Sequence, residues 1–474
     1  MIPMTLDEIA RAVDGTLGAG ADGMAVATGV STDSRSVAAG DLFVAIVGER
    51  VDAHDLVPDA LAAGAVAVLA SRPVDVPHVL VDDTVAALGR LARHVLATRP
   101  GIVVVGVTGS SGKTSTKDLL AQVLPAYGPT VAPQGSFNTE VGLPVTALGV
   151  SPSTRVLVAE MGARGVGHIR YLCGITPPRI GVVLNVGSAH VGEFGSREAI
   201  AQAKGELVES LPSAGDGGVA VLNADDPLVL AMRDRTRARV LAYGESVGAD
   251  VRALDVVLDD LGRASFTLSA EGRTAPVSLG LHGRHHVSNA VAVATVGLAL
   301  GLDLDEVAAS LSAARPASRW RMEVSQTTSG VTVVNDAYNA NPESMGAALQ
   351  ALAAMTRPQQ GLPARRSVAV LGEMFELGDV SVAEHEEIGR MAVRLGVDRV
   401  VAVGTSDPVH ALARGAVRES GDGSRAVVVP TVDAAVGVLV TELSPGDVVL
   451  VKASRAVGLE RVATALLGQG AAPA

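Results

Sequence analysis

A chain of 474 residues is too long for a single hydrophobic core, so its length predicts two to four domains. Hydrophobic residues make up 48% of the sequence and aromatic residues only 2%, so Ala, Val and Leu must fill the interior, as in α/β layers. The net charge of −12, with no basic block, argues against nucleic acid as the main partner.

The remaining bulk features indicate where the protein works. Cys173 is the only cysteine, so no intrachain disulfide can form. The first residues lack the basic and apolar regions of a signal peptide, and no apolar stretch approaches the roughly 20 residues that span a bilayer. We therefore expect a cytoplasmic protein without membrane insertion, and a monomer.

Residues 1–99 predict a small N-terminal domain of mixed type. Residues 6–13 have the apolar spacing of a helix, with Thr5 as its cap. Short strands are expected at 41–47, 65–69 and 78–81. Two polar clusters lie near strand ends; each alone would be read as a solvated turn, but together they suggest a ligand-binding face. Its candidate residues are Ser31, Asp33, Ser34, Arg35, Asp52 and His54.

The rest of the chain alternates strand and helix in two blocks, residues 100–315 and 316–474. The first predicts a central domain with a mostly parallel sheet, and the second predicts a C-terminal Rossmann-like domain. The strands are expected at 102–107, 156–159, 180–184 and 219–222, and then at 331–334, 368–371, 400–403, 426–429 and 448–451. The fold class is therefore α/β with three domains. Ligands should collect at the carboxyl ends of the parallel strands.

The most informative stretch, residues 106–115, reads Gly-Val-Thr-Gly-Ser-Ser-Gly-Lys-Thr-Ser. It stands between an apolar strand and a helix, the context of a phosphate-binding P-loop, although Val107 occupies the position of the first template glycine. Lys113 would reach the terminal phosphates of a nucleotide, and the Thr114 hydroxyl would bind Mg²⁺. The nucleotide-binding candidates are Gly109, Ser110, Ser111, Gly112, Lys113, Thr114 and Ser115.

Three further side chains follow strands of the central block. Glu160 ends an apolar strand, where a carboxylate could hold the metal, and His190 lies in a Gly-rich loop after the next strand. Lys204 lies in a helix of small residues; if it is buried, a lowered pKa would let its neutral amine react with CO₂ to give a carbamate. The plainer alternative is a solvated cap for Glu160, a structural histidine for His190 and, for Lys204, a helix lysine that snorkels so that its charge reaches solvent.

Two residues of the last block are candidates for nucleotide contacts. Arg321 follows the boundary near residue 316, and Asp336 follows the first strand of the block. If the two blocks face each other, Arg321 could take a phosphate and Asp336 a ribose hydroxyl. A surface arginine and a turn aspartate are the equally plain alternative.

The ordered set of motifs resembles the Mur ligases, ATP-dependent amide-forming enzymes of peptidoglycan precursor synthesis. The motifs are T-G-S-S-G-K-T, A-E-M-G, N-V-G-S-A-H, A-K-G-E, R-M-E and D-A-Y-N-A-N-P. Their order and the L-G-E-M-F-E-L-G stretch resemble the branch that joins D-alanyl-D-alanine to UDP-N-acetylmuramoyl-tripeptide. The resemblance implies ATP and Mg²⁺ as cofactors, an acyl-phosphate intermediate, and this tripeptide and dipeptide as partners.

The resemblance also implies roles for individual residues. Thr114 and Glu160 would hold one metal at the phosphates, His190 would hold a second metal, and a carbamylated Lys204 would also face the metal site. Lys113 would bind the phosphates and Arg321 the γ-phosphate. Asn289 would contact adenine and Asp336 the ribose. The residues expected to contact the UDP-peptide and the incoming dipeptide include Asn138, Thr139, Tyr338 and Asn339, in addition to the N-terminal clusters.

Two alternatives remain open at this point. A related ligase, such as a folylpolyglutamate synthetase or the enzyme that adds the third peptide residue, would share the P-loop, but the first lacks a UDP-binding module and the second carries a D-N-P-R motif absent here. A nucleotide-dependent switch or assembly protein would hydrolyse ATP without any peptide acceptor. It would leave the strand-end residues of the last block without a role.

Overall fold

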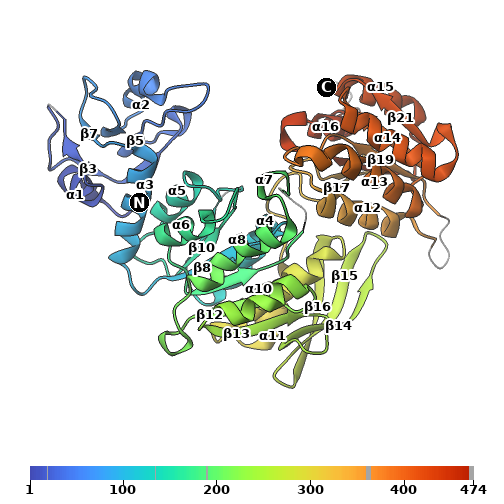
Figure 1. The fold of residues 1–474 in the computed structure, drawn as a ribbon, viewed down its shortest axis with the longest axis horizontal. Coiled ribbons are helices and arrows are strands. Elements are labelled where there is room, and N and C mark those ends of the chain that lie inside the picture. The colour runs from blue at the N-terminus through green and yellow to red at the C-terminus, as the bar shows by residue number, and fades with distance from the viewer. Residues whose placement is uncertain (19, 134, 188–190, 359–363, 469–474) are drawn as a thin grey trace.

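The computed structural model describes residues 1–474 except 19, 134, 188–190, 359–363 and 469–474. Its described strands form three large sheets and one two-stranded ribbon, interleaved with helices. Figure 1 shows the N-terminal sheet and the C-terminal sheet at opposite ends of the central one. The α/β class is thus confirmed. Among the described residues, every helix is too short or too polar to cross a membrane.

The N-terminal part contains a five-stranded sheet in the order β2-β7-β6-β5-β4, parallel except at β2. Thr5 caps the first helix in a capping box with Glu8, as the sequence predicts in part. The strands are β1 Met4–Thr5, β2 Thr16–Leu17, β3 Val26–Ala27, β4 Gly29–Ser31, β5 Asp41–Val44, β6 Ala67–Ala70 and β7 His78–Leu80. The helices are α1 Leu6–Ala12, α2 Val57–Ala62 and α3 Thr84–Ala97, with 3₁₀ turns η1 Ser34–Ser36 and η2 Ala53–Leu56.

The central part is built on a nine-stranded sheet in the order β16-β15-β14-β13-β12-β11-β8-β10-β9. Its strands are β8 Val103–Thr108, β9 Thr130–Val131, β10 Val156–Glu160, β11 Ile180–Val183, β12 Val219–Asn223, β13 Arg239–Gly244, β14 Val251–Leu258, β15 Arg263–Ala270 and β16 Arg273–His282. Its helices are α4 Lys113–Val123, α5 Gly142–Leu148, α6 His168–Ile175, α7 Val191–Phe194, α8 Arg197–Glu209, α9 Pro227–Leu230, α10 His285–Ala299 and α11 Leu304–Ala313.

Strand β8 shows how the two faces of this sheet are packed. Val103, Val105 and Val107 belong to the core on the side of α4, α10 and α11, whereas Val104 joins the core that continues under α3, α5 and α6. Gly106 faces this second side, where a Cβ would lie 2.9 Å from the Leu207 side chain of α8. The glycine one place before the usual P-loop position therefore permits close packing of α8 on the sheet.

The C-terminal part is a six-stranded sheet in the order β17-β18-β22-β19-β20-β21, parallel except at β17, with a core on each face. Its strands are β17 Glu323–Gln326, β18 Thr332–Asn335, β19 Ser367–Leu371, β20 Arg399–Val403, β21 Ala426–Val429 and β22 Val448–Lys452. Its helices are α12 Pro342–Thr356, α13 Ser381–Arg394, α14 Asp407–Ser420, α15 Val432–Glu442 and α16 Glu460–Gly468. This doubly wound sheet agrees with the predicted Rossmann-like arrangement.

The strands expected from the sequence all occur, but five strands of the central sheet, β9 and β13 to β16, are not predicted from the sequence. Strands β13 to β16 extend one edge of this sheet, and β15 pairs antiparallel with both β14 and β16. Along β16, buried and less buried residues alternate, so only one face is packed. Such strands lack the continuous Val-rich run that marks a strand buried on both faces.

Helices α13 and α14 approach each other closely through glycines. A Cβ on Gly389 would lie 1.9 Å from the Leu412 carbonyl oxygen, and one on Gly415 would lie 2.0 Å from the Glu386 carbonyl oxygen. Backbone cannot move aside as a flexible side chain can. We predict that Gly389→Ala lowers the free energy of unfolding by about 2 kcal/mol, the usual cost of overpacking.

Gly437→Ala in α15 is the matched control, because a Cβ there meets no atom within 4 Å. This control should be neutral or stabilising, since alanine favours a helix over glycine. Urea and thermal denaturation of the full chain would measure both. Equal stability of the two variants would show that the helices are not in close contact.

Candidate functional site

The P-loop lies where β8 ends and α4 begins, as the sequence predicts. Gly112 has φ +81°, in the left-handed region, and a Cβ there would lie 2.7 Å from Asn289 Oδ1. The turn is also bonded to the loop after β11: Ser111 N–H donates to Asn185 Oδ1 at 2.9 Å, and Gly187 N–H donates to Ser110 Oγ at 2.9 Å. These contacts fix the backbone N–H groups that would cradle a phosphate.

The two P-loop side chains of interest contact different partners. Lys113 Nζ donates to the Gly109 carbonyl oxygen at 2.7 Å. Burial lowers the pKa of Lys113, with Arg321 adding to the effect and Glu160 opposing it. The Thr114 hydroxyl lies 2.9 Å from Ser136 Oγ and 3.4 Å from Glu160 Oε1. The loop thus places a cation and a hydroxyl on one cavity of about 260 Å³.

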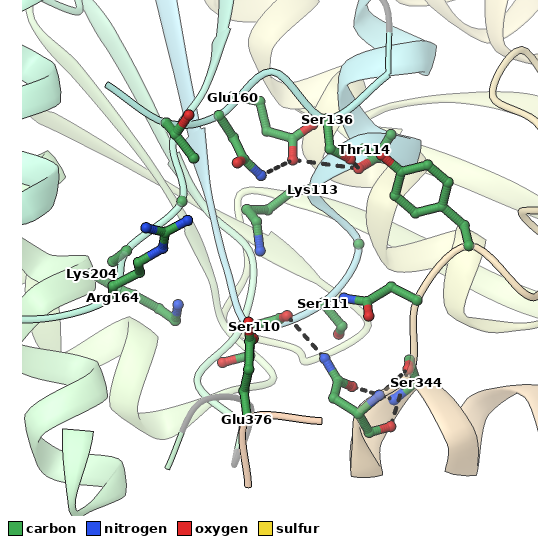
Figure 2. A pocket seen from close by; sticks show the side chains of 18 of the residues that line it. Ser110, Ser111, Lys113, Thr114, Ser136, Glu160, Arg164, Lys204, Ser344 and Glu376 are labelled. Atoms are coloured by element: carbon green, nitrogen blue, oxygen red, sulfur yellow. Dashed lines mark hydrogen bonds between the residues drawn. The ribbon is translucent and has the colours of Figure 1, made fainter. Parts of the chain in front are cut away.

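Glu160 ends β10 at the carboxyl edge of the sheet and is 1% exposed. Its Oε1 accepts a hydrogen bond from Asn138 Nδ2 at 2.9 Å. Figure 2 shows Glu160 beside Ser136 and Thr114. Its buried Oε2 has no hydrogen-bond partner among the described residues. A buried carboxylate oxygen that lacks a donor costs free energy, so this atom is suited to bind a metal cation that enters with a ligand.

Lys204 lies in α8, is 4% exposed and lines the same cavity. Burial, reinforced by the positive charge of Lys113, lowers the pKa of Lys204 well below its usual value, and Glu343 partly opposes this shift. The surface-lysine alternative is therefore wrong. A buried lysine with a lowered pKa has the neutral amine that carbamate formation needs.

Arg321 reaches the cavity from the linker between the central and C-terminal sheets. The linker is bonded to α4: Gln122 exchanges two hydrogen bonds with the Arg315 backbone, at 2.9 and 3.0 Å, and Ser318 N–H donates to Asp118 at 3.2 Å. Arg321 Nη2 then donates to Thr114 Oγ1 at 3.1 Å. An arginine of the last block and a P-loop threonine are therefore in direct contact.

The backbone around Arg321 has an unusual conformation. Trp320 and Met322, on either side of it, have φ values of +58° and +49°, which cost energy in residues with a side chain. Met322 N–H donates to Asp336 Oδ1 at 3.1 Å, and the Arg321 guanidinium stacks on the Tyr338 ring at 4.2 Å. These contacts hold the arginine toward the P-loop.

Asp336 is buried at the end of β18, outside the cavity lining. Its Oδ2 accepts from Lys452 Nζ at 2.6 Å, and Lys452 also donates to the Asn339 carbonyl oxygen at 2.9 Å. The pair fixes the D-A-Y-N loop, which brings Tyr338 and Asn339 to the cavity. The ribose contact of Asp336 stays a prediction.

The N-terminal clusters lie at the carboxyl ends of the neighbouring parallel strands β4 and β5, not on the P-loop cavity. Arg35 forms an ion pair with Asp33 at 2.7 Å, and the Ser31 hydroxyl donates to the Asp33 carbonyl oxygen at 2.9 Å. Buried His54 contacts Asp52 at 2.6 Å through Nδ1, and its Nε2 accepts from Ser71 N–H at 3.1 Å. These two bonds place the imidazole proton on Nδ1.

Most of the predicted central residues meet in one place. The cavity is lined by Ser110, Ser111, Gly112, Lys113, Thr114, Asn138, Thr139, Glu160, Lys204, Arg321, Tyr338 and Asn339. Gly109 does not line the cavity, but its carbonyl oxygen accepts the hydrogen bond from Lys113, which does. Ser115 lines a smaller neighbouring pocket beside α4. Asn289 is buried against Gly112. His190 lies outside the described residues.

Sequence reasoning did not select several cavity residues. Ser136 bonds to Thr114, and Asn341 both caps α12 and donates to the Ser110 carbonyl oxygen at 3.4 Å. Asn341 is the last asparagine of the D-A-Y-N-A-N-P motif, which could have singled it out. Ser136 follows a strand of two residues, β9, which leaves no periodic signal.

The donor set fits a Mg²⁺ ion bound with a nucleotide. Thr114 offers a hydroxyl and Glu160 an unpaired carboxylate oxygen, the oxygen ligands that Mg²⁺ prefers. Within the described part of the chain, no cluster of three or more His, Cys, Asp or Glu side chains has metal-binding geometry.

Comparison with known proteins gives consistent matches along the chain. The Mur ligase family catalytic domain matches residues 26–96, the Mur ligase middle domain 107–297, and the Mur ligase glutamate ligase domain 320–455. The sequence is 48% identical to the UDP-N-acetylmuramoyl-tripeptide–D-alanyl-D-alanine ligase of Mycobacterium tuberculosis, over 98% of each chain.

Two solved structures have the same overall fold. One is the UDP-N-acetylmuramoylalanyl-D-glutamyl-2,6-diaminopimelate–D-alanyl-D-alanyl ligase of Acinetobacter baumannii, with TM-score 0.83, 31% identity and 98% coverage of both chains. The other is the MurF ligase of Thermotoga maritima in complex with ADP, with TM-score 0.79, 32% identity, and 93% and 97% coverage. These similarities extend over nearly the whole sequence, and the chain belongs to the Mur ligase family.

Proposed function

We propose that the protein is an ATP-dependent ligase that joins D-alanyl-D-alanine to UDP-N-acetylmuramoyl-tripeptide in peptidoglycan precursor synthesis. The observation that carries this proposal is the single cavity in which a P-loop, a buried carboxylate and a buried lysine meet an arginine from the last block. The relative from Mycobacterium tuberculosis bears the name of this ligase, and the Thermotoga maritima structure holds ADP.

In the proposed reaction, a carboxylate oxygen of the tripeptide attacks the γ-phosphorus of ATP, and ADP leaves. The dipeptide amine, in its neutral form, then attacks the resulting acyl phosphate; an amide bond forms, phosphate leaves and the amine gives up a proton. Lys113 and Arg321 stabilise the negative charge on the transferred phosphoryl group, because both line the cavity and Arg321 already contacts the P-loop.

Mg²⁺ would supply charge neutralisation of the phosphates, and Thr114, Glu160 and a carbamylated Lys204 would hold it. The buried and otherwise unpaired Oε2 of Glu160 supports this assignment. Asn289, buried beside Gly112 with an unpaired Nδ2 among the described residues, is the proposed adenine contact. His190, proposed from the family resemblance as a ligand of a second metal, lies outside the described residues.

We divide the substrates among three parts of the chain. Residues 1–99 bind the UDP end through the clusters at β4 and β5, residues 100–315 bind ATP, and residues 316–474 bind the dipeptide and part of ATP. Tyr338 and Asn339 face the cavity from the last part, as the dipeptide requires. The proposed active form is a monomer in the cytoplasm.

The activity can be tested by phosphate release. We predict release only when ATP, UDP-N-acetylmuramoyl-tripeptide and D-alanyl-D-alanine are all present, with a mass-spectrometric product equal to their condensation. Lys113→Met should lose roughly 10²- to 10³-fold in kcat, the usual loss for a donor that stabilises transition-state charge. Equal phosphate release with no peptide acceptor would favour a nucleotide switch, and release with a single amino acid would favour another ligase.

The role of Lys204 has its own test. Because burial lowers its pKa, more of the amine is neutral near pH 7, so dissolved CO₂ should form a carbamate. We predict that Lys204→Ala lowers kcat roughly 10²-fold or more and that formate or acetate partly restores it, because either anion can replace the missing carboxylate. The same anions should leave the wild-type enzyme unchanged. A fully active Lys204→Ala variant would exclude the carbamate role.

A further inference from the structure

Arg164 is a cavity residue that the reaction described above does not use. It lies between β10, which ends at Glu160, and α6, which begins at His168. Its side chain lines the same cavity as Asn138, Thr139 and Lys204, and Figure 2 shows it on the Lys204 side of that space. The guanidinium therefore lines the same cavity as Asn138 and Thr139, the two residues proposed to contact the UDP-peptide.

The loop that carries Arg164 is held in place by other groups. Arg164 N–H donates to His168 Nδ1 at 3.3 Å, and His168 Nε2 contacts Glu140 at 3.2 Å. Glu206, fully buried in α8, accepts from the backbone N–H of Gly167 and from that of Arg170 at 3.0 Å. The two carboxylates that contact this loop are thus engaged by an imidazole and by backbone N–H groups.

The guanidinium of Arg164, in contrast, forms no hydrogen bond or ion pair with any described residue. Nearby cations are engaged: Arg170 pairs with Glu209 at 2.9 Å, and Lys113 donates to the Gly109 carbonyl oxygen. Arg321 bonds to Thr114. Because an arginine stays charged at any physiological pH, Arg164 presents a fixed positive charge and a planar fork of donors to the cavity.

A guanidinium with free donors matches a carboxylate, which it can bind through two parallel hydrogen bonds. The reacting carboxylate belongs at the proposed metal site, where Lys113 and Arg321 face the transferred phosphoryl group, which leaves the donors of Arg164 for another group. We propose that Arg164 binds a second, non-reacting carboxylate of the tripeptide and thereby selects and orients this substrate. This inference rests on the proposed ligase function.

Such a carboxylate has two possible sources in the tripeptide. The substrate named for the Acinetobacter baumannii relative contains a D-glutamyl residue and a diaminopimelate residue, and each carries a carboxylate besides those used in amide bonds or in the reaction. A tripeptide with lysine in third position keeps the glutamyl carboxylate and the side-chain ammonium group but lacks the side-chain carboxylate of diaminopimelate. With lysine, the ammonium group would stand near Arg164 without the accompanying carboxylate, which leaves two like charges unbalanced and is unfavourable.

The experiment compares two substrates with the full-length enzyme. Steady-state phosphate release is measured with UDP-N-acetylmuramoyl-tripeptides that end in meso-diaminopimelate or in lysine, for wild type, Arg164→Met and Arg164→Lys. We expect Arg164→Met to raise KM for the diaminopimelate substrate roughly tenfold to a hundredfold with little change in kcat. Arg164→Lys should recover part of this loss, since it keeps the charge but not the fork.

The comparison of the two substrates shows which of the two carboxylates binds Arg164. A loss confined to the diaminopimelate tripeptide assigns the side-chain carboxylate of the third residue, and an equal loss with both assigns the glutamyl carboxylate. Unchanged KM for both substrates would overturn the proposal, as would a fall in kcat alone. Wild-type enzyme that releases phosphate with neither substrate would instead contradict the proposed ligase function.

Arg155→Met is the matched control, because exposed Arg155 precedes the opposite end of the same strand, β10, and does not line the cavity. Its KM for each substrate should equal the wild-type value. Thermal unfolding of Arg164→Met should also match wild type, since the side chain is exposed and has no described partner. A lower transition temperature would assign Arg164 a structural role and overturn the proposal.

Discussion

The site depends on one constraint, the close packing of the P-loop against the loop after β11 and against helix α10. Gly112 leaves no room for a Cβ beside Asn289, and Ser111 is bonded to Asn185. Thr114 then meets Arg321, which the linker and Met322 hold in a strained backbone. A phosphate-binding turn is common to many nucleotide-binding proteins; the residues fixed around this turn make it part of a site for phosphoryl transfer.

Burial determines what the charged residues of this cavity can do. Glu160 is buried away from water, and one of its oxygens has no donor in the part of the chain that the structure describes, so a cation bound there would be held strongly. The same loss of water lowers the pKa of Lys204 and makes its amine available to CO₂. Arg164 lies at the more open wall of the cavity, where a charge can be kept without a protein partner. The buried residues proposed for the reaction, Glu160 and Lys204, and the exposed Arg164 proposed to recognise the substrate thus line the same cavity.

Much of this arrangement could be predicted from the sequence, for identifiable reasons. Lys113, Glu160 and Asn335-Asp336 follow continuous Val-rich strands, and the parallel-strand rule places such residues at a common edge. Strands β14 to β16 were missed because only one face of each is packed. The partners of a residue were also unpredictable: nothing local indicates that Lys452 pairs with Asp336, or that Ser136 bonds to Thr114. Such contacts join segments far apart in the chain, and only the packed fold brings them together.

The central claim is that ATP activates the tripeptide carboxylate as an acyl phosphate in this cavity. Oxygen labelling tests it most directly: the tripeptide is prepared with ¹⁸O in its reacting carboxylate, and the phosphate released during ligation is examined by mass spectrometry. In an acyl phosphate, one carboxylate oxygen bridges carbon and phosphorus, so it departs with the phosphate when the dipeptide amine attacks. We expect one ¹⁸O atom in each phosphate from fully labelled substrate; unlabelled phosphate released together with the ligated product would contradict the mechanism.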